Sequence, residues 1–222
     1  MRIVLMGPPG AGKGTQSSLC AKEFNVPKLA TGDMLRAEVK NETPLGKKVK
    51  DVMDRGDLVS DDIILRIIES RINRPDAHNG FILDGFPRTV AQAQAMDEII
   101  ARNGLSLDAI INLSVPEDEL VKRFTGRRVA EGSGRVYHTE YNPPKQKGRC
   151  DETGEPLKQR KDDTEEVVRH RLSVYQEETT PVIRFYKSQD RLTEVDGQQP
   201  MEDVFKEIRS VVKSQNAKAA QA

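Results

Sequence analysis

The sequence has few of the groups on which several classes of protein depend. It lacks tryptophan, and aromatic residues make up only 5% of its 222 residues, so stacking platforms for single-stranded nucleic acid are not expected. Its two cysteines, Cys20 and Cys150, form no CxxC pair, so neither a disulfide framework nor a zinc knuckle is indicated. Lys+Arg and Asp+Glu number 35 each, so no overall charge attracts the chain to nucleic acid or membrane.

Long hydrophobic runs are also missing. No apolar stretch approaches the ~20 residues of a membrane-spanning helix. The apolar start, residues 1–6, meets Gly7 too soon for a signal peptide. We therefore expect a cytoplasmic protein with one main domain and, at this length, small inserted lobes.

Short apolar runs alternate with helical patterns along the chain. Buried strands are predicted at residues 3–6, 81–83, 109–113 and 192–195, each followed or preceded by an amphipathic stretch. This alternation predicts an α/β fold, a three-layer α/β/α arrangement with a parallel sheet. Residues 128–160 are rich in glycine, proline and charge, and they predict an inserted lobe of small strands and turns. A long helix is predicted from Asp162, with its apolar side chains at spacings of three, four or seven.

A glycine-rich segment, residues 7–13, follows the first predicted strand and opens a helix. Glycines let the backbone curl so that N–H groups face an anion, and the helix N-terminus adds partial positive charge. Lys13 can then bridge the outer phosphates of a nucleotide. Gly14 stands where the general pattern has serine or threonine, and Thr15 follows it. The alternative, a strand–helix turn without a ligand, is much the weaker interpretation.

The segment Asp84–Arg88 stands at the carboxyl end of the second predicted strand, where open α/β sheets bind ligands. Asp84 is placed to hold Mg²⁺, through water, because magnesium keeps much of its hydration shell. Taken alone, this segment is more typical of an ordinary Asp-Gly turn with a solvated arginine.

Arginines recur around these two motifs. For any one of them a structural ion pair is the more common explanation. Together they indicate phosphoryl transfer, which requires positioning and positive charge rather than covalent chemistry. The acidic stretch that begins at Asp162-Asp163 is predicted to be a solvated helix start, and the three histidines are predicted to lie on the surface. The arginines are Arg36, Arg88, Arg123, Arg127, Arg160 and Arg171.

Three segments together resemble the adenylate kinase family in order and spacing: residues 7–15, residues 31–36 (TGDMLR) and residues 84–88 (DGFPR). Residues 134–138, 142–145 and 160–163 are similar to its long-lid branch. The resemblance implies a P-loop core (1–29, 60–125 and 164–222), an inserted helical AMP-binding lobe (30–59) and a small β-rich lid (126–163).

The resemblance also implies residue roles. The catalytic residues would be Lys13 and the six arginines. ATP would be bound by Gly10, Ala11, Gly12, Lys13, Gly14, Thr15, Arg123, Arg127, Val136, Tyr137 and Gln199. AMP would be bound by Thr31, Arg36, Asp57, Leu58, Val59, Gly85, Phe86, Pro87, Arg88, Gln92, Arg160 and Arg171.

The implied partners are the nucleotides ATP, AMP and ADP with Mg²⁺, acting on a monomer without nucleic acid or membrane. Some long-lid relatives hold zinc in the lid, but the matching positions here are Ala130, Ser133, Cys150 and Thr153. Cys150 is the only good zinc donor among them, so no structural zinc is expected.

Three alternatives stay open from the sequence. Another nucleoside monophosphate kinase is possible, because the AMP assignment rests on Thr31 and Gln92. A GTP:AMP phosphotransferase is possible, because such enzymes share the long lid. A nucleotide-dependent switch is remote, because it leaves residues 84–88 without a role.

Overall fold

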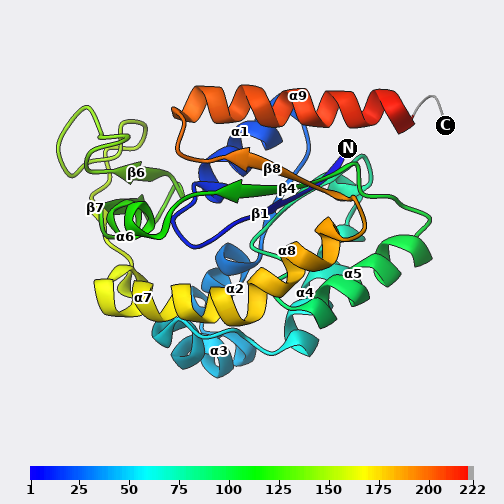
Figure 1. The fold of residues 1–222 in the computed structure, drawn as a ribbon. Helices are drawn as coiled ribbons and strands as arrows, with labels where there is room; N and C mark the ends of the chain where they lie inside the picture. Colours follow the sequence, from blue (N-terminus) through cyan, green and yellow to red (C-terminus); the bar gives the residue numbers. More distant parts are fainter. Residues whose placement is uncertain (220–222) are drawn as a thin grey trace.

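The computed structural model describes residues 1–219, and a five-stranded parallel sheet forms the centre of the molecule (Figure 1). The strand order β2-β3-β1-β4-β8 places the first strand in the middle, between β3 and β4. The strands are β1 (Arg2–Met6), β2 (Lys28–Ala30), β3 (Phe81–Asp84), β4 (Ala109–Ser114) and β8 (Leu192–Asp196).

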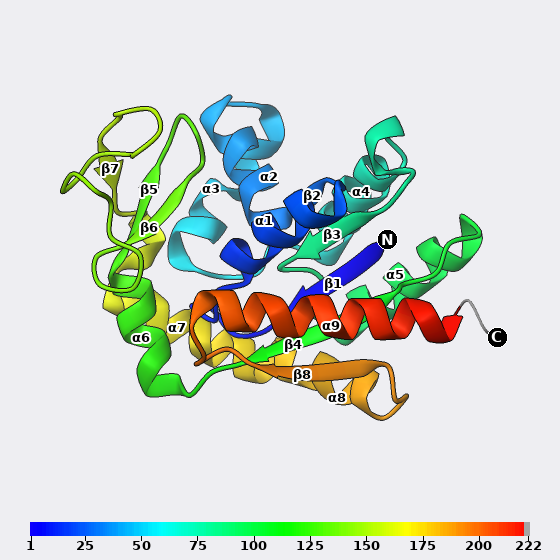
Figure 2. The ribbon, with the colours of Figure 1, turned by 90° about the horizontal axis from the view of Figure 1, so that it is seen from above.

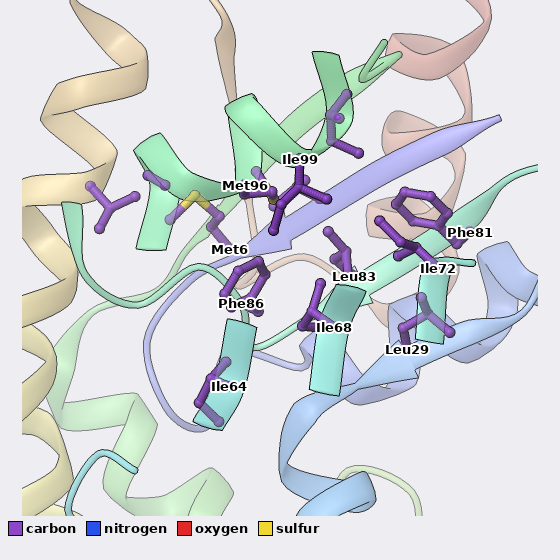
Figure 3. Close-up of a cluster of buried hydrophobic side chains, with 14 of the residues drawn as sticks. Met6, Leu29, Ile64, Ile68, Ile72, Phe81, Leu83, Phe86, Met96 and Ile99 are labelled. Carbon is purple, nitrogen blue, oxygen red and sulfur yellow. The ribbon is translucent and has the colours of Figure 1, made fainter. Parts of the chain in front are cut away.

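Helices cover both faces of this sheet, as the alternating pattern predicts. Figure 1 shows α1 and α9 on one face and α4, α5 and α8 on the other. Alternate residues of β1 serve the two cores: Ile3 and Leu5 face one, and Val4 and Met6 face the other. Figure 3 shows part of the second core, where Met6 lies among side chains from β3, α4 and α5. The helices are α1 (Lys13–Phe24), α4 (Asp61–Ile72), α5 (Val90–Arg102), α8 (Thr180–Lys187) and α9 (Met201–Ala219).

Strand β2 has no counterpart among the four core strands predicted from sequence. It is three residues long, begins with a lysine and follows Pro27, so neither length nor periodicity marks it. Its partner is β3, and Leu29 lies opposite Leu83. This edge strand leads directly into the next helix and so helps to shape the site.

Two further units are attached to the sheet. One consists of α2 (Thr31–Lys40) and α3 (Pro44–Arg55), which pack on each other. The other is a three-stranded antiparallel sheet of β5 (Arg127–Ala130), β6 (Val136–His138) and β7 (Leu157–Lys158), which follows α6 (Glu117–Thr125). In Figure 1 the arrows of β4 and β8 point towards this small sheet, which lies on the same side of the molecule in Figure 2.

The long helix predicted from Asp162 is a rod with several kinds of turn. A 3₁₀ turn spans Lys161–Asp163, and α7 (Glu165–Val174) follows. A π turn (Tyr175–Thr179) then leads into α8, and Figure 1 shows α7 and α8 as one continuous coil. Pro181 is the second residue after the π turn, and in a regular helix its ring would clash with the carbonyl group four residues earlier. In residues 1–219, no helix has the length and apolar character that crossing a membrane requires.

Candidate active site

The glycine-rich loop between β1 and α1 curls as its sequence predicts. Gly10 and Gly12 have φ angles of 88° and 90°, which side-chain-bearing residues rarely adopt. A Cβ atom on Gly10 would lie 2.9 Å from the carbonyl oxygen of Leu120. Gly12 caps α1 without a side-chain hydrogen bond, so the first N–H groups of that helix are available to an anion.

The Lys13 side chain folds back onto the start of this loop. Its ammonium group donates to the carbonyl oxygens of Gly7 (2.7 Å) and Pro8 (2.8 Å). Desolvation lowers the pKa of Lys13 to about 7, and although Asp84 opposes this shift, nearby arginines add to it. Because burial destabilises the charged form of this side chain, an anionic ligand would stabilise that form strongly.

The segment Asp84–Arg88 leaves β3 at the same edge of the sheet. The peptide bond between Phe86 and Pro87 is cis. The Arg88 Nε–H donates to the Gly85 carbonyl oxygen at 2.8 Å, and the Arg88 backbone N–H donates to Gln92 Oε1. Burial lowers the pKa of the Arg88 guanidinium, and Arg36 adds to this shift although Asp84 opposes it. The segment is thus a held turn rather than a solvated one.

Phe124, on α6, supports two of the predicted arginines. The Arg127 guanidinium lies 4.2 Å from the centre of the Phe124 ring, and the Arg171 guanidinium lies 4.7 Å from it. The ring is buried, with 2% of its surface exposed. Cation–π attraction and this rigid contact fix both guanidinium groups from the side away from solvent.

The prediction that Asp162-Asp163 is a solvated helix start is wrong. Asp163 is fully buried and accepts two hydrogen bonds from Arg127, from Nε at 2.8 Å and from Nη2. Asp162 accepts from Arg171 Nη1 at 2.6 Å. Sequence alone could not show these pairs, because Arg127 comes from strand β5, 36 residues away, and Arg171 lies nine residues further along the rod. The α-helix itself begins at Glu165.

The predicted site residues come together around a cleft of about 610 Å³ and a smaller adjoining cavity. The cleft is lined by the phosphate loop, by Asp84 and by all six arginines. Val136, Tyr137, Gln199, Leu58, Phe86 and Pro87 also line it. The smaller cavity adds Thr31, Asp57, Val59 and Gln92. Arg36, Gly85, Arg88 and Arg171 line both spaces.

The charge of the cleft contrasts with that of the whole chain. Lys13, Lys28 and the six arginines face two acidic residues, Asp33 and Asp84, which gives the lining a formal net charge of +6 in a protein whose formal net charge is zero. Desolvation, aided by repulsion from Arg36 and Arg127, lowers the pKa of Arg160 to about 10. Such a concentration of like charge requires an anionic ligand of several charges.

Several residues that line the cleft were given no role by sequence reasoning. Lys28 stands outside the motifs, Asp33 lies within the segment 31–36 without an assigned role, and Phe124 has the pattern of an ordinary core residue. Tyr141 lies with its ring 5.6 Å from the Arg123 guanidinium, and its hydroxyl donates to Glu119 at 3.1 Å. His138 was predicted to be a surface residue, but it is partly buried and lines the cleft.

Comparison with known proteins adds independent information. The adenylate kinase family model matches residues 5–191. The chain belongs to the adenylate kinase family. It is 48% identical over 212 residues to the adenylate kinase of Carboxydothermus hydrogenoformans, with 96% of this chain and 99% of that protein covered. It is also 48% identical to the adenylate kinases of Archaeoglobus fulgidus (96% and 98% covered) and Streptomyces avermitilis (98% and 99% covered).

Polar contacts hold together the segment that contains the small antiparallel sheet of this adenylate kinase family member. Glu155 accepts from the backbone N–H groups of Gly132 and Ser133 and from the Thr153 hydroxyl. These hydrogen bonds, the one from Gly132 first, lower the pKa of Glu155 to about 2. The Cys150 sulfur lies 3.4 Å from the Tyr137 hydroxyl, and hydrogen bonds from Thr153 and Tyr137 lower the thiol pKa to about 6.

Proposed function

We propose that the protein acts as an adenylate kinase, which transfers the γ-phosphoryl group of MgATP reversibly to AMP and yields two molecules of ADP. The observation that carries this proposal is the net charge of +6 around a phosphate loop, in a family member whose chain is neutral. Phosphoryl transfer depends on positioning and on charge stabilisation, and this cleft is suited to both.

The two nucleotides would occupy the cleft and the smaller cavity. The donor triphosphate belongs with the loop Gly10–Thr15, Arg123 and Arg127, and its base with Val136, Tyr137 and Gln199. The acceptor belongs with the smaller cavity, which includes Thr31, residues 57–59 and Gln92. Support for the assignment comes from Arg36, Arg88 and Arg171, which line both spaces. The donor and acceptor phosphates would meet at these three arginines.

The residues of the chain would act by charge and geometry. Lys13 would move from its two carbonyl partners to the outer phosphates, where its ammonium group offsets charge that develops on the transferred group. Arg88 and Arg171, which are held by Gly85 and Asp162, would orient the acceptor phosphate. Arg127 and Arg160 stand at the ends of the lid segment, so lid closure would complete the arginine cage and exclude water.

We propose the same three units that the resemblance implies. The core comprises residues 1–29, 60–125 and 164–222, the AMP-binding lobe residues 30–59, and the lid residues 126–163. Helices α2 and α3 lie within the second range and the small antiparallel sheet within the third. One ion pair already joins the two inserted units, because Arg160 Nη2 lies 3.4 Å from Asp33 Oδ1. The cytoplasmic location and the monomeric state stay predictions.

Asp84 would hold Mg²⁺ through water. The residues present fit a metal ion that arrives bound to its nucleotide. Two carboxylates, on Asp84 and Asp33, line the cleft. Residues 1–219 contain no group of three or more His, Cys, Asp or Glu side chains that could hold a metal ion by itself. Mg²⁺ of this kind is bound by one or two carboxylates, substrate phosphates and its own water. When bound, it supplies positive charge between the phosphates of the donor.

The identity of the donor base is the most detailed part of the proposal. The Gln199 side chain donates to Glu207 at 3.0 Å, so base selection near residue 199 would fall to backbone groups. Adenine is favoured on the family assignment, and GTP is the alternative donor. ADP formation should be measured for ATP and GTP against AMP, CMP, UMP and GMP. Turnover highest with ATP and AMP, and dependent on AMP, is expected; the same rate with AMP left out would indicate a hydrolase or a switch.

Two substitutions test the assignment of the sites. Lys13→Met should lower turnover by ~100-fold or more while thermal unfolding is preserved, because one preorganised charge is lost. Arg88→Ala should weaken AMP binding more than ATP binding in calorimetry with each nucleotide alone. Near-normal turnover of the first variant would refute the role of the phosphate loop, and selective loss of ATP binding in the second would reverse the two sites.

We also propose that the lid contains no structural zinc. Ala130 offers no side-chain donor, and the contacts of Glu155 with residues 132, 133 and 153 supply the cross-links that a metal would otherwise provide. Elemental analysis after dialysis against chelator should find less than one-tenth of a zinc per chain, roughly the background of such a preparation. One tightly held zinc per chain that disappears in Cys150→Ser would contradict the proposal.

A further inference from the structure

Lys28, the first residue of the unpredicted strand β2, reaches the floor of the cleft. Its ammonium nitrogen lies 3.3 Å from Asp84 Oδ2 and 4.0 Å from Asp33 Oδ2. It donates to the Gly14 carbonyl oxygen at 3.0 Å and to the Ser18 hydroxyl at 3.4 Å. The side chain is 21% exposed, so this is a held cation and not a surface lysine.

The position follows from the pairing of β2. Residues 28 and 30 alternate with Leu29, whose side chain is buried in the core shown in Figure 3. Lys28 therefore points to the opposite side of the sheet, towards α1. Ala30 pairs with Asp84, so Lys28 starts two residues upstream and extends along the strand to the carboxylate. Gly14 lies next to the ammonium nitrogen, because a Cβ atom built on it would be in ordinary van der Waals contact at 3.6 Å.

The two ion pairs of Lys28 involve both acidic residues that line the cleft, Asp84 and Asp33. The same oxygen, Asp84 Oδ2, also accepts from the Ser17 hydroxyl at 3.0 Å, so that oxygen is already occupied. A divalent cation near Asp84 would meet the ammonium group, which repels it, and a carboxylate whose charge is partly offset. The remaining contacts of Lys28, with Gly14 and Ser18, keep the ammonium group in place when the carboxylate turns to another cation.

We propose that Lys28 is a positioning residue that sets the metal affinity of the site: its ammonium group is a fixed counter-cation of Asp84 and Asp33. The inference rests on the proposed function, which assigns Asp84 to the metal. The protein alone then binds Mg²⁺ poorly, and the metal enters and leaves with its nucleotide. Loss of Lys28 strengthens metal binding, and with it the retention of the metal–nucleotide product.

The experiment compares Lys28→Gln, which removes the charge, with Lys28→Arg, which keeps it. Mn²⁺ binding to the nucleotide-free protein is followed by the loss of the free-ion signal in electron paramagnetic resonance. Lys28→Gln should bind Mn²⁺ roughly threefold to tenfold more tightly than the unmodified protein, the effect of one nearby charge. Lys28→Arg should leave the affinity within twofold. Lys22→Gln, which removes an exposed lysine from α1, is the matched control for net charge.

A second readout is the free Mg²⁺ concentration at half-maximal turnover, which should fall in Lys28→Gln and stay unchanged in Lys22→Gln. Unchanged or weaker Mn²⁺ binding in Lys28→Gln, with normal thermal unfolding, overturns the inference. Asp84→Asn separates this failure from a failure of the proposed function. If Asp84→Asn leaves the Mg²⁺ requirement as it is, the assignment of Asp84 is wrong. If Asp84→Asn raises that requirement while Lys28→Gln changes nothing, only the role of Lys28 is wrong.

Discussion

Binding of ATP should take up a proton at Lys13 when the pH is above 7. The pKa of Lys13 in the nucleotide-free protein is about 7, lowered from 10.5 first by desolvation. One pH unit above that value, at pH 8, about nine-tenths of the amine is neutral. A triphosphate in the loop favours the charged ammonium group, so its binding raises the pKa again. The expected uptake by Lys13 at pH 8 is therefore about 0.9 proton per nucleotide.

The same linkage gives the pH dependence of affinity. Lys13 is already charged below pH 7, so in that range it adds no dependence. Above pH 7 a proton must be bound together with the nucleotide, so ATP affinity should fall by up to tenfold for each pH unit. The fall should end where pH reaches the pKa of the amine in the complex. The interval between pH 7.5 and 9 is thus the most informative.

Isothermal titration calorimetry at pH 8 measures the uptake directly. ATP alone is titrated in two buffers of different ionisation enthalpy, and the difference in apparent heat gives the number of protons. Lys13→Arg is the matched control, because arginine keeps the positive charge but stays protonated throughout this pH range. Protons released or bound by ATP itself cancel in the comparison. Equal proton uptake by the two proteins would refute the reasoning.

Three further substitutions have expected effects. Asp163→Asn should lower the free energy of unfolding by about 2 kcal/mol in a denaturant titration, because the Arg127 guanidinium loses its buried partner but keeps some contact with solvent. His170→Gln should raise the KM for AMP about threefold and leave that for ATP unchanged, because His170 Nε2 lies 2.7 Å from Asp57 in the proposed AMP-binding lobe. Gly46→Ala should unfold that lobe at lower temperature, detected by limited proteolysis, because a Cβ would lie 2.1 Å from a carbonyl oxygen of α2.

Each of these has a result that would count against it. Glu165→Gln breaks an exposed pair with Arg169, so it should change stability by less than about 0.5 kcal/mol. If Asp163→Asn were no more harmful than that control, the buried pair would not stabilise the fold. A rise in the KM for ATP in His170→Gln would place the contact on the donor side, and a protease-resistant Gly46→Ala would show that α2 and α3 can separate.

The parts of the fold that the sequence predicts are those with local signals. Strands β1, β3 and β4 are apolar runs next to glycine or charge, and β8 is a short stretch that ends just before Gly197. The phosphate loop is marked by its glycines and by Lys13. Strand β2 is not predicted, because three residues are too few to show a hydrophobic periodicity. Its pairing with β3, rather than its own β-propensity, makes it a strand.

The predicted site residues also gather as expected, but their partners could not be foreseen. Asp163 and Arg127 are 36 residues apart, and Lys28 and Asp84 are 56 apart, so neither pair leaves a trace in local sequence. Motif reasoning finds groups that touch a ligand, since chemistry restricts their type and spacing. The side chains that position these groups depend on the tertiary fold, because residues of many types, from many parts of the chain, can supply the supporting contacts.

The π turn at Tyr175–Thr179 fixes the angular phase between the two ends of the rod. Arg171 faces the cleft at one end, and Tyr186 is fully buried against α5 at the other, with its hydroxyl 3.4 Å from the Ala93 carbonyl oxygen. Each residue of a helix turns the next by about 100°. If this segment had one residue fewer and Tyr186 stayed in place, the Arg171 side chain would be rotated about the helix axis by roughly 100°, away from the phosphates. The extra residue in the π turn is therefore part of the aiming of an arginine that it never contacts.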